Sequence, residues 1–453
     1  MRKIRIKLII TYFTINIAFL SNGFLYVHDF QFYEKSNSEY SNSFNISSNS
    51  SSWSQILGID TFAEKIVTDS SNNVYIAGGF CTNREGPIFN VKFDEYGQKL
   101  WNSTWKLNND TKFIADLAVD SKQKIYNLIN FYFLEDTSIL MKINNSGNSI
   151  WNQTLEGTAR SIYLDDYDNI YILGNVWDSR RDGQHIYLKK FNTDGISQWN
   201  HSFLLDDYYL LYGFPCTIMV DHLNQTYIAG IISTGSWSFS FDNYWGAPII
   251  FTCVYSSSGS LVSFNSWHRE DYYISSTMIF DILGNLYLMG TDKEITQNII
   301  LKYDSSWHLN KTIDVWQNDA IRGTSDVWAS ISIDNSKNIY CAGINSFFSG
   351  NELYLVKFNS SGHLEFDGAW NNLSSTWCFD IHVDSDLNIY VTGLTGIGLY
   401  NKRALIIKNP VLGEFSDPPT PIDIPYIISI SSIVFVCGVA GIYFIIQFRR
   451  RFL

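Results

Sequence analysis

The chain has 453 residues and a formal net charge of −12, and 16 % of its residues are aromatic. A chain of this length can bury a large core, and the aromatic content favours stacked sheets. Because the sequence offers no basic stripe, we expect no nucleic-acid partner.

Residues 1–27 predict a signal peptide or a signal-anchor. The basic start MRKIRIK precedes an apolar run from Leu8 to Val27, and small residues at 21–23 offer a cleavage position. The run is long for a cleaved signal, so both alternatives stay open. Residues 28–52 are rich in Ser and Asn and predict a linker without a core of its own.

A fourteen-residue phrase recurs seven times within residues 53–410, at intervals of 45 to 60 residues. One copy reads IYLDDYDNIYILGN (162–175). Every copy has an Asp in fourth place, namely Asp69, Asp120, Asp165, Asp221, Asp281, Asp334 and Asp384. Every copy has a Tyr six residues later, namely Tyr75, Tyr126, Tyr171, Tyr227, Tyr287, Tyr340 and Tyr390. Fixed offsets repeated in this way indicate a repeat architecture.

Each phrase predicts two short strands joined by a tight turn, since apolar residues precede the Asp and β-branched and aromatic residues follow it. The Asp is expected to accept hydrogen bonds from backbone N–H groups of the turn. The residue four positions after the Asp is expected to take the left-handed conformation of the turn, and it is an Asn at Asn73, Asn169, Asn285, Asn338 and Asn388. The second strand is apolar on both faces, so it must be covered on both faces.

A second phrase follows each first one and predicts another hairpin, as in KFNTDGISQWN (190–200). Its turn contains a Gly in five copies, namely Gly97, Gly147, Gly195, Gly259 and Gly362. Two hairpins per repeat make four strands, which is one blade. The sequence therefore predicts an all-β fold, a seven-bladed β-propeller over residues 53–410.

The two ends of this region predict how the ring closes. Residues 53–57 (WSQIL) have the pattern of an outer strand but precede the first repeat, whereas residues 404–410 supply a third strand with no outer strand after it. We therefore expect the N-terminal strand to pair with the C-terminal strand and complete the last blade, which protects a sheet edge.

The C-terminal region predicts a membrane anchor. Residues 411–425 are Pro-rich and suit a stiff spacer, and residues 426–447 are 22 uncharged residues, enough for a transmembrane helix. The basic tail 448–453 is expected to stay in the cytoplasm. Because the basic N-terminus is also expected there, the propeller is predicted to lie outside the cell membrane.

The chain contains Asn-x-Ser/Thr sequons, which fit a glycoprotein outside the cell. They occur at Asn45, Asn49, Asn102, Asn109, Asn144, Asn152, Asn200, Asn224, Asn310, Asn359 and Asn372. A chain rich in Asn, Ser and Thr also forms sequons by chance, and this alternative stays open.

The paired phrases resemble the SBBP repeat, a seven-bladed β-propeller repeat of prokaryotic secreted and surface proteins. The residues that carry the resemblance are Asp-x-x-x-Asn-x-Tyr-x-x-x-Gly, followed by Lys-Phe-Asn-x-x-Gly-x-x-x-Trp. The resemblance covers nearly all of 53–410. It implies a surface or secreted propeller, no single activity and no catalytic residues.

The sequence offers no catalytic motif, metal ligand set or cofactor site. A calcium ladder built from the repeated Asp residues would need six or more oxygens in one short loop. One Asp per turn is better explained as turn capping, so we expect neither metal nor cofactor.

Blade four carries the most informative irregularity, a long loop that contains STGSWSFSFDNYWG (233–246). This loop and the two flanking blade connections predict an aromatic and acidic rim. Its candidate ligand-binding residues are Trp237, Tyr244, Trp245, Tyr208, Tyr209, Asp271, Tyr272 and Tyr273. Such a rim suits sugar stacking or a protein partner. The alternative is a hydrophobic lid folded over the blade.

These features predict a membrane-anchored extracellular binding or adhesion module for a glycan or protein partner. The alternatives are an envelope enzyme built on a propeller, either glycan-cleaving or quinone-linked, and a structural surface-coat component. A buried cluster of acids in the central channel would favour the enzyme, and a channel of aliphatic or small residues the binding module.

Overall fold

The structure is a computed structural model of the chain. It describes residues 52–80, 86–107, 112–131, 137–178, 183–204, 212–233, 249–268, 272–292, 298–315, 327–347, 350–370, 375–397 and 400–410, with the pairs 18–19 and 25–26. Contacts divide the chain into one unit, Ser41–Phe415, and a second that combines Met1–Tyr40 with Ser416–Leu453. In the second unit, β1 (Ala18–Phe19) pairs with β2 (Leu25–Tyr26).

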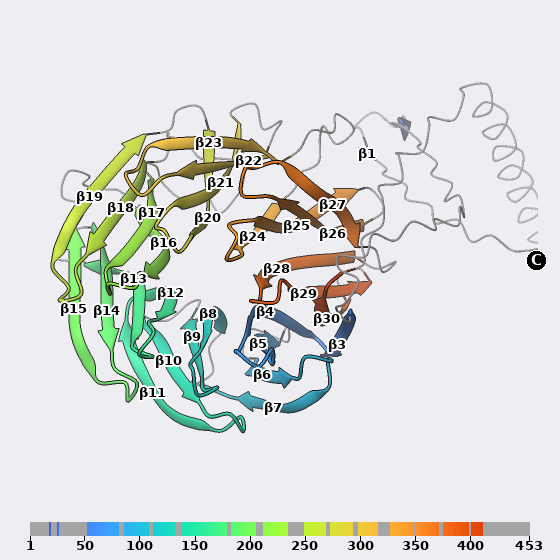
Figure 1. Cartoon of the computed structure of the whole chain (residues 1–453). Coiled ribbons are helices and arrows are strands. Elements are labelled where there is room, and N and C mark those ends of the chain that lie inside the picture. The colour runs from blue at the N-terminus through green and yellow to red at the C-terminus, as the bar shows by residue number, and fades with distance from the viewer. Residues whose placement is uncertain are drawn as a thin grey trace, which may run out of the picture. The chain divides into compact units, whose positions relative to one another are not determined.

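The unit Ser41–Phe415 is a seven-bladed β-propeller of four-stranded antiparallel sheets (Figure 1). Blade 1 contains β4 (Thr61–Thr68), β5 (Val74–Phe80), β6 (Ile88–Phe93) and β7 (Lys99–Trp105). Blade 2 contains β8 (Lys112–Val119), β9 (Ile125–Phe131), β10 (Thr137–Ile143) and β11 (Ser149–Glu156). Blade 3 contains β12 (Thr158–Leu164), β13 (Ile170–Asp178), β14 (Gly183–Phe191) and β15 (Ser197–Leu204).

The remaining blades repeat this order. Blade 4 contains β16 (Tyr212–Val220), β17 (Thr226–Ser233), β18 (Ile249–Tyr255) and β19 (Leu261–His268). Blade 5 contains β20 (Tyr272–Phe280), β21 (Leu286–Asp292), β22 (Asn298–Tyr303) and β23 (Leu309–Asp314). Blade 6 contains β24 (Val327–Ile333), β25 (Ile339–Phe347), β26 (Gly350–Phe358) and β27 (Leu364–Trp370). Blade 7 contains β28 (Ser375–Val383), β29 (Ile389–Ile397), β30 (Tyr400–Lys408) and β3 (Trp53–Ile59).

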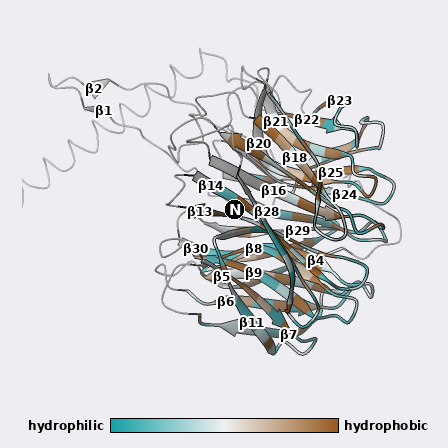
Figure 2. Ribbon diagram, turned by 90° about the vertical axis from the view of Figure 1, so that its left-hand side faces the viewer, coloured by the Kyte–Doolittle hydropathy of each residue, from teal (hydrophilic) through white to brown (hydrophobic). Residues whose placement is uncertain are grey.

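The first strand of each blade is innermost, and these strands contact one another around the centre of the ring (Figure 1). The core is divided into seven apolar clusters, one between each pair of adjacent blades. In Figure 2 hydrophobic stretches, coloured brown, run along the strands of the blades. The expectation that the strands are covered on both faces is confirmed, because each blade packs against a neighbour on either side.

In blade 7 the strand β3 pairs with β30, and the register runs from Trp53↔Lys408 to Ile59↔Arg403. The side chains of β3 also reach blade 1. Trp53 Nε1 donates to the carbonyl oxygen of Glu95 at 3.0 Å, and Gln55 Nε2 donates to that of Gly97 at 3.0 Å. Gly97 has φ of +80°, and a Cβ there would lie 2.7 Å from the Trp53 ring, so a larger residue would disturb this contact.

One sequence expectation for the Asp turns is wrong. The left-handed residue is the third after the Asp, at Asn72, Gln123, Asp168, Asn224, Gly284, Lys337 and Leu387. The fourth residue, where Asn73, Asn169, Asn285, Asn338 and Asn388 occur, returns to the strand and gives its side-chain amide to the Asp in four of these turns. Asn388 does the same in the fifth. The Asn is therefore selected for its side-chain hydrogen bond rather than for its backbone.

No helix in the part of the chain that the structure describes is long and apolar enough to cross a membrane. The predicted spacer 411–425, membrane helix 426–447 and basic tail 448–453 lie outside the described residues. So does the linker, apart from Ser52.

Candidate functional site

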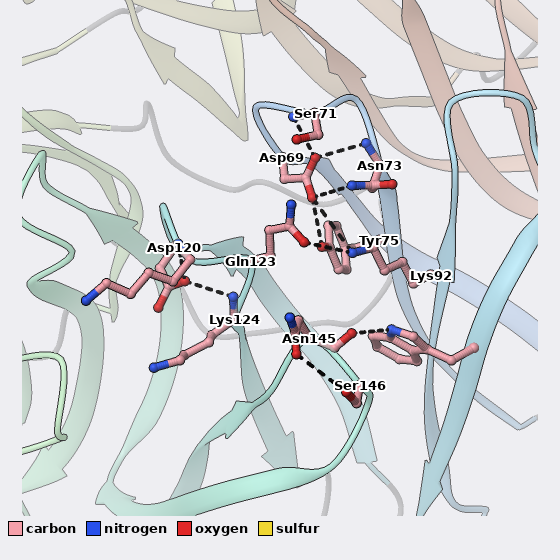
Figure 3. Close-up of polar contacts among 12 residues, drawn as sticks. Asp69, Ser71, Asn73, Tyr75, Lys92, Asp120, Gln123, Lys124, Asn145 and Ser146 are labelled. Atoms are coloured by element: carbon pink, nitrogen blue, oxygen red, sulfur yellow. Dashed lines mark hydrogen bonds and ion pairs between the residues drawn. The ribbon is translucent and has the colours of Figure 1, made fainter.

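The repeated Asp and Tyr residues form a polar cluster with a Lys from the third strand of the same blade (Figure 3). In blade 1, Asp69 Oδ1 accepts the backbone N–H groups of Ser71 at 2.8 Å and Asn73 at 3.0 Å. Asp69 Oδ2 accepts the Tyr75 hydroxyl at 2.9 Å. Lys92 Nζ lies 3.9 Å from the same oxygen and 4.8 Å above the centre of the Tyr75 ring.

Burial changes the pKa values of the Tyr and the Lys in this cluster. Desolvation, helped by Asp69, raises the pKa of Tyr75, so the phenol keeps its proton and donates it. Desolvation lowers the pKa of Lys92, although Asp69 opposes this change. Because both carboxylate oxygens of Asp69 are used inside the turn, the structure supports turn capping. Among the described residues no group of His, Cys, Asp and Glu could hold a metal ion.

Six blades carry the Lys, and its Nζ lies over the ring of the repeat Tyr in each. The six are Lys92, Lys142, Lys190, Lys302, Lys357 and Lys408. In blade 4 the residue that pairs with Tyr227 on β18 is Val254. Asp221 and Tyr227 are half-buried, whereas the corresponding Asp and Tyr side chains of the other blades are buried. Blade 4 is therefore the one blade of the seven that lacks the Lys at this position.

A cavity of about 210 Å³ lies beside this Asp, and we call it the blade-4 cavity. Its lining comes from the Asp turns of blades 3 to 5, namely Tyr163, Asp165, Asp166, Met219, Val220, Asp221, His222 and Ile282. Three carboxylates, an imidazole and a phenol thus share one small volume. The cavity adjoins the start of β17, whereas the long loop of blade 4 follows the end of β17.

A second candidate is a polar ring on the innermost strands. The residue four positions before each repeat Asp is polar in all seven blades, namely Lys65, Asp116, Ser161, Thr217, Thr277, Ser330 and Asp380. A register shift of the inner strand lies just before this position in six blades, and in blade 5 it includes Thr277. A bulge leaves a backbone group without its ladder partner, so polar side chains are needed nearby.

The carboxylates of this ring meet that need across blade boundaries. Asp116 Oδ2 accepts the hydroxyl of Ser161 and the backbone N–H of Ile162 in blade 3, both at 2.9 Å. Glu64, which precedes Lys65 on β4, acts in the same way: its Oε2 accepts the backbone N–H of Ile114 in blade 2 at 2.7 Å. Each carboxylate therefore joins its blade to the next one.

Blade 7 is joined to both of its neighbours in the same way. Asp380 accepts the hydroxyl of Ser330 in blade 6 at 2.8 Å and the backbone N–H of Ile66 in blade 1 at 3.2 Å. Lys65 Nζ lies 3.9 Å from Asp380. Interblade hydrogen bonds therefore link the inner strands of blades 6, 7, 1, 2 and 3 in succession.

Burial and neighbouring charges shift the pKa values of the ionisable groups at the centre of the ring. Desolvation raises the pKa of Glu64 to about 8, although the backbone N–H of Ile114 and the Lys65 charge lower it. Desolvation also raises the pKa of Asp116. Desolvation lowers the pKa of Lys65, but Asp380, Asp116 and Glu64 together outweigh it, so this pKa is raised. A carboxyl such as Glu64 that stays protonated at neutral pH can donate a proton.

The predicted rim of blade 4 is not described by the structure. Trp237, Tyr244, Trp245, Tyr208, Tyr209 and Asp271 lie outside the described residues. Tyr272 and Tyr273 begin β20, and only their backbone is described. Whether these residues form a binding rim or a lid stays a prediction.

Sequence reasoning missed the blade-4 cavity and the polar ring, although both leave a signal in the repeats. Aligning the second phrases shows Val254 where six copies begin with Lys, and this exception marks Asp221. Aligning the first phrases shows the polar position four residues before the Asp. The repeat pattern does not mark His222 or Tyr163. These two residues come from different blades, and only the assembled ring brings them to one cavity.

Comparison with known proteins supports the fold. No family model matches the chain, and no curated protein matches it by sequence. A polysaccharide lyase of family PL25, an ulvan lyase, aligns at 9 % identity and a TM-score of 0.51, covering 82 % of this chain and 100 % of that chain. The β-propeller domain of the Trilobed protease from Pyrococcus furiosus aligns at 10 % identity and a TM-score of 0.45, covering 80 % and 98 %. At such identities the likeness shows a β-propeller alone, and the SBBP resemblance stays a prediction.

Proposed function

We propose that this protein is a membrane-anchored binding module whose propeller faces outward and holds a cationic group of a glycan or protein partner in the blade-4 cavity. The observation that carries this proposal is the replacement of the repeat Lys by Val254, which pairs with Tyr227 in the blade of Asp221. The anchor is the predicted helix 426–447, and the outward orientation follows from the basic residues at both chain ends.

Electrostatics favours a cationic ligand at this position. In blade 3, Lys190 Nζ lies 3.7 Å from Asp165 Oδ2, and the positive charge of the Lys compensates the negative charge of this carboxylate. Asp221 lines the same cavity as Asp165 and Asp166 without such a partner. Two opposite unit charges about 4 Å apart attract each other by roughly 4 kcal/mol at the effective dielectric of a protein surface. A ligand ammonium or guanidinium group would take the role that Lys plays in blades 1 to 3.

The rest of the cavity suits the same ligand. The Tyr163 ring offers an aromatic face, which attracts a cation through the ring quadrupole. His222, when neutral, can exchange hydrogen bonds with a hydroxyl or an amine. The negative charge of the chain as a whole would also draw a cationic partner, since the formal net charge is −12.

A glycan-cleaving enzyme is the second candidate, and the half-buried carboxyls at the centre of the ring favour it. Glu64 combines a raised pKa with nearby Asp116 and Asp380, which is the kind of acid and carboxylate set that glycoside cleavage uses. The lyase named among the structural neighbours acts on a polysaccharide, which makes glycans reasonable substrates to try. Against this candidate, all three carboxyls already accept hydrogen bonds from neighbouring blades.

The test uses the full chain in detergent and matched pairs of probes. One pair is a chitosan oligosaccharide and its N-acetylated form, and the other is a lysine-rich peptide and its acetylated form. We expect at least one amine probe to bind, its acetylated form to bind at least tenfold more weakly, and Asp221→Asn to weaken the amine probe tenfold. Asp384→Asn makes the same change in a blade that has its Lys, and it should leave the Kd unchanged.

Equal binding of both members of each pair would contradict a cationic ligand. New reducing ends or unsaturated products formed from a glycan, and lost in Glu64→Gln, would favour the enzyme instead. These outcomes are distinct, because the two candidates place the functional residues at different positions in the ring.

A further inference from the structure

Three neighbouring blades carry a sequon at the same position of the outermost strand. Asn102 on β7, Asn152 on β11 and Asn200 on β15 each follow the Trp of the second phrase. Their register partners are Val91, Met141 and Lys189, which occupy equivalent positions on the third strands. The Asn belongs to the repeated Trp-Asn pair of the second phrase, and in these three blades a Ser or Thr follows it two positions later.

The side chains at these positions point away from the sheet stack. Along β7 and β11 exposed residues alternate with half-buried ones, and the Asn lies on the exposed side while the Trp before it lies on the covered side. Asn200 is likewise exposed next to the covered Trp199. The hydroxyl residues of the three sequons, Thr104, Thr154 and Ser202, are exposed as well. Both groups that a glycosylating enzyme must reach are therefore at the surface.

The propeller itself does not require Asn here. The same register position is Phe264 in blade 4 and Asp367 in blade 6, and both blades form the same four-stranded sheet. Within the described residues, the side-chain amides of Asn102, Asn152 and Asn200 take part in no hydrogen bond. A structural role therefore does not explain why Asn recurs with a hydroxyl residue two positions later.

We propose that Asn102, Asn152 and Asn200 carry N-linked glycans that cover the outer edges of blades 1 to 3. The donor would be an oligosaccharide linked to a lipid phosphate. A bond forms between the Asn Nδ2 and C1 of the first sugar, the bond from C1 to the phosphate oxygen breaks, and the proton lost by the amide passes overall to the leaving phosphate. The lipid phosphate leaves, and no oxidant or reductant is needed.

Glycans at this place would have a clear physical effect. The outermost strand of each sheet presents a row of unpaired backbone groups that can pair with another chain. A bulky hydrated glycan in the middle of that strand blocks such pairing without displacing a native contact. The outer strand of blade 4, with exposed Val262 and Phe264, would stay uncovered.

The test compares variants of the full chain produced in its own membrane. Thr104→Ala, Thr154→Ala and Ser202→Ala each remove one sequon, and each should lower the apparent mass by one similar step. Thr104→Ser and Thr154→Ser preserve the sequons and should leave the mass unchanged. Glycopeptide mass spectrometry of the unaltered protein should find sugar on Asn102, Asn152 and Asn200.

The proposal assumes the outward orientation of the proposed function, so protease accessibility on sealed cells is measured on the same samples. Unmodified Asn102, Asn152 or Asn200 in a chain that is accessible from outside would overturn the glycan proposal alone. Unmodified residues in an inaccessible chain would overturn the orientation and the glycan proposal with it. Because the altered side chains are exposed, thermal melting should stay within about 2 °C, which excludes misfolding as the cause.

Discussion

At the scale of single residues, the repeat Asp, Tyr and Lys explain both the regularity of the propeller and its exception. The Asp shapes the turn, and the Tyr brings a polar atom into an apolar cluster where only the Asp can satisfy it. In blades 1 to 3 the Lys also forms an ion pair with the Asp. Blade 4 has Val254 in place of the Lys but keeps Asp221 and Tyr227. The blade therefore still folds, and its Asp turn has one positive charge fewer.

The Tyr hydroxyl should contribute measurably to stability in a complete cluster. Tyr75→Phe removes the donor to Asp69 at a buried position and should lower the free energy of unfolding by about 1–2 kcal/mol. Tyr227→Phe is the matched control, because its hydroxyl lies 3.4 Å from Asp221 at a half-buried position. It should cost less than about 0.5 kcal/mol. Denaturant titration of both variants checks this order, and equal losses would contradict it.

Glu64 should give the protein a distinctive pH dependence. An unfolded Glu releases its proton near 4.5, whereas the folded one holds it to about 8. Between these values the folded state binds more protons, so the free energy of unfolding falls as pH rises. Glu64→Gln cannot titrate and can still accept from Ile114. Its melting temperature relative to the unaltered protein should therefore rise from pH 5 to pH 8, and a constant difference would refute the raised pKa.

At the scale of elements, the sequence was sufficient to predict seven blades of four strands. The reason is physical: each repeat must bury both faces of its second strand, and only neighbouring blades can do this. The residue with positive φ was misplaced by one position, because Asn offers both a tolerant backbone and a side-chain amide. Pattern alone does not separate these two properties.

The candidate site was predictable only in part. The sequence singled out blade 4 through its long loop, and the structure singles out the same blade through Asp221 and Val254. The cavity itself depends on how three turns from different blades converge, as with Tyr163 and Ile282. Such convergence has no counterpart in a single repeat, so it required the assembled ring.

The strand β3 should be essential for stability. We propose that it closes the ring, since it completes the sheet of blade 7 and its Trp53 and Gln55 bond to blade 1. Deleting 53–57 should lower stability by far more than the roughly 1 kcal/mol of a typical substitution. Deleting five linker residues, 42–46, is the control and should change little. Equal melting curves for the two deletions would mean that the ring closes without β3.

At the scale of the whole molecule, the proposed topology places residues 28–425 outside the membrane. Protease added to intact cells should remove the propeller and leave a short membrane-protected piece that contains 426–447. Lysed cells provide the control for protease activity, and an antibody tag after Leu453 reports the protected piece. Full protection of the propeller in intact cells that lack a covering outer layer would contradict the orientation.

The affinity of Val254→Lys for an amine probe is the most direct test of the binding proposal. In blade 5 the equivalent Lys302 lies 5.0 Å above the ring of Tyr287, and a Lys at 254 should adopt the same position beside Asp221. It would supply the charge that we assign to the ligand. We predict at least tenfold weaker binding with an unchanged or higher melting temperature, while the uncharged Val254→Met keeps its affinity within about twofold. Undiminished binding by a folded Val254→Lys protein would contradict the account.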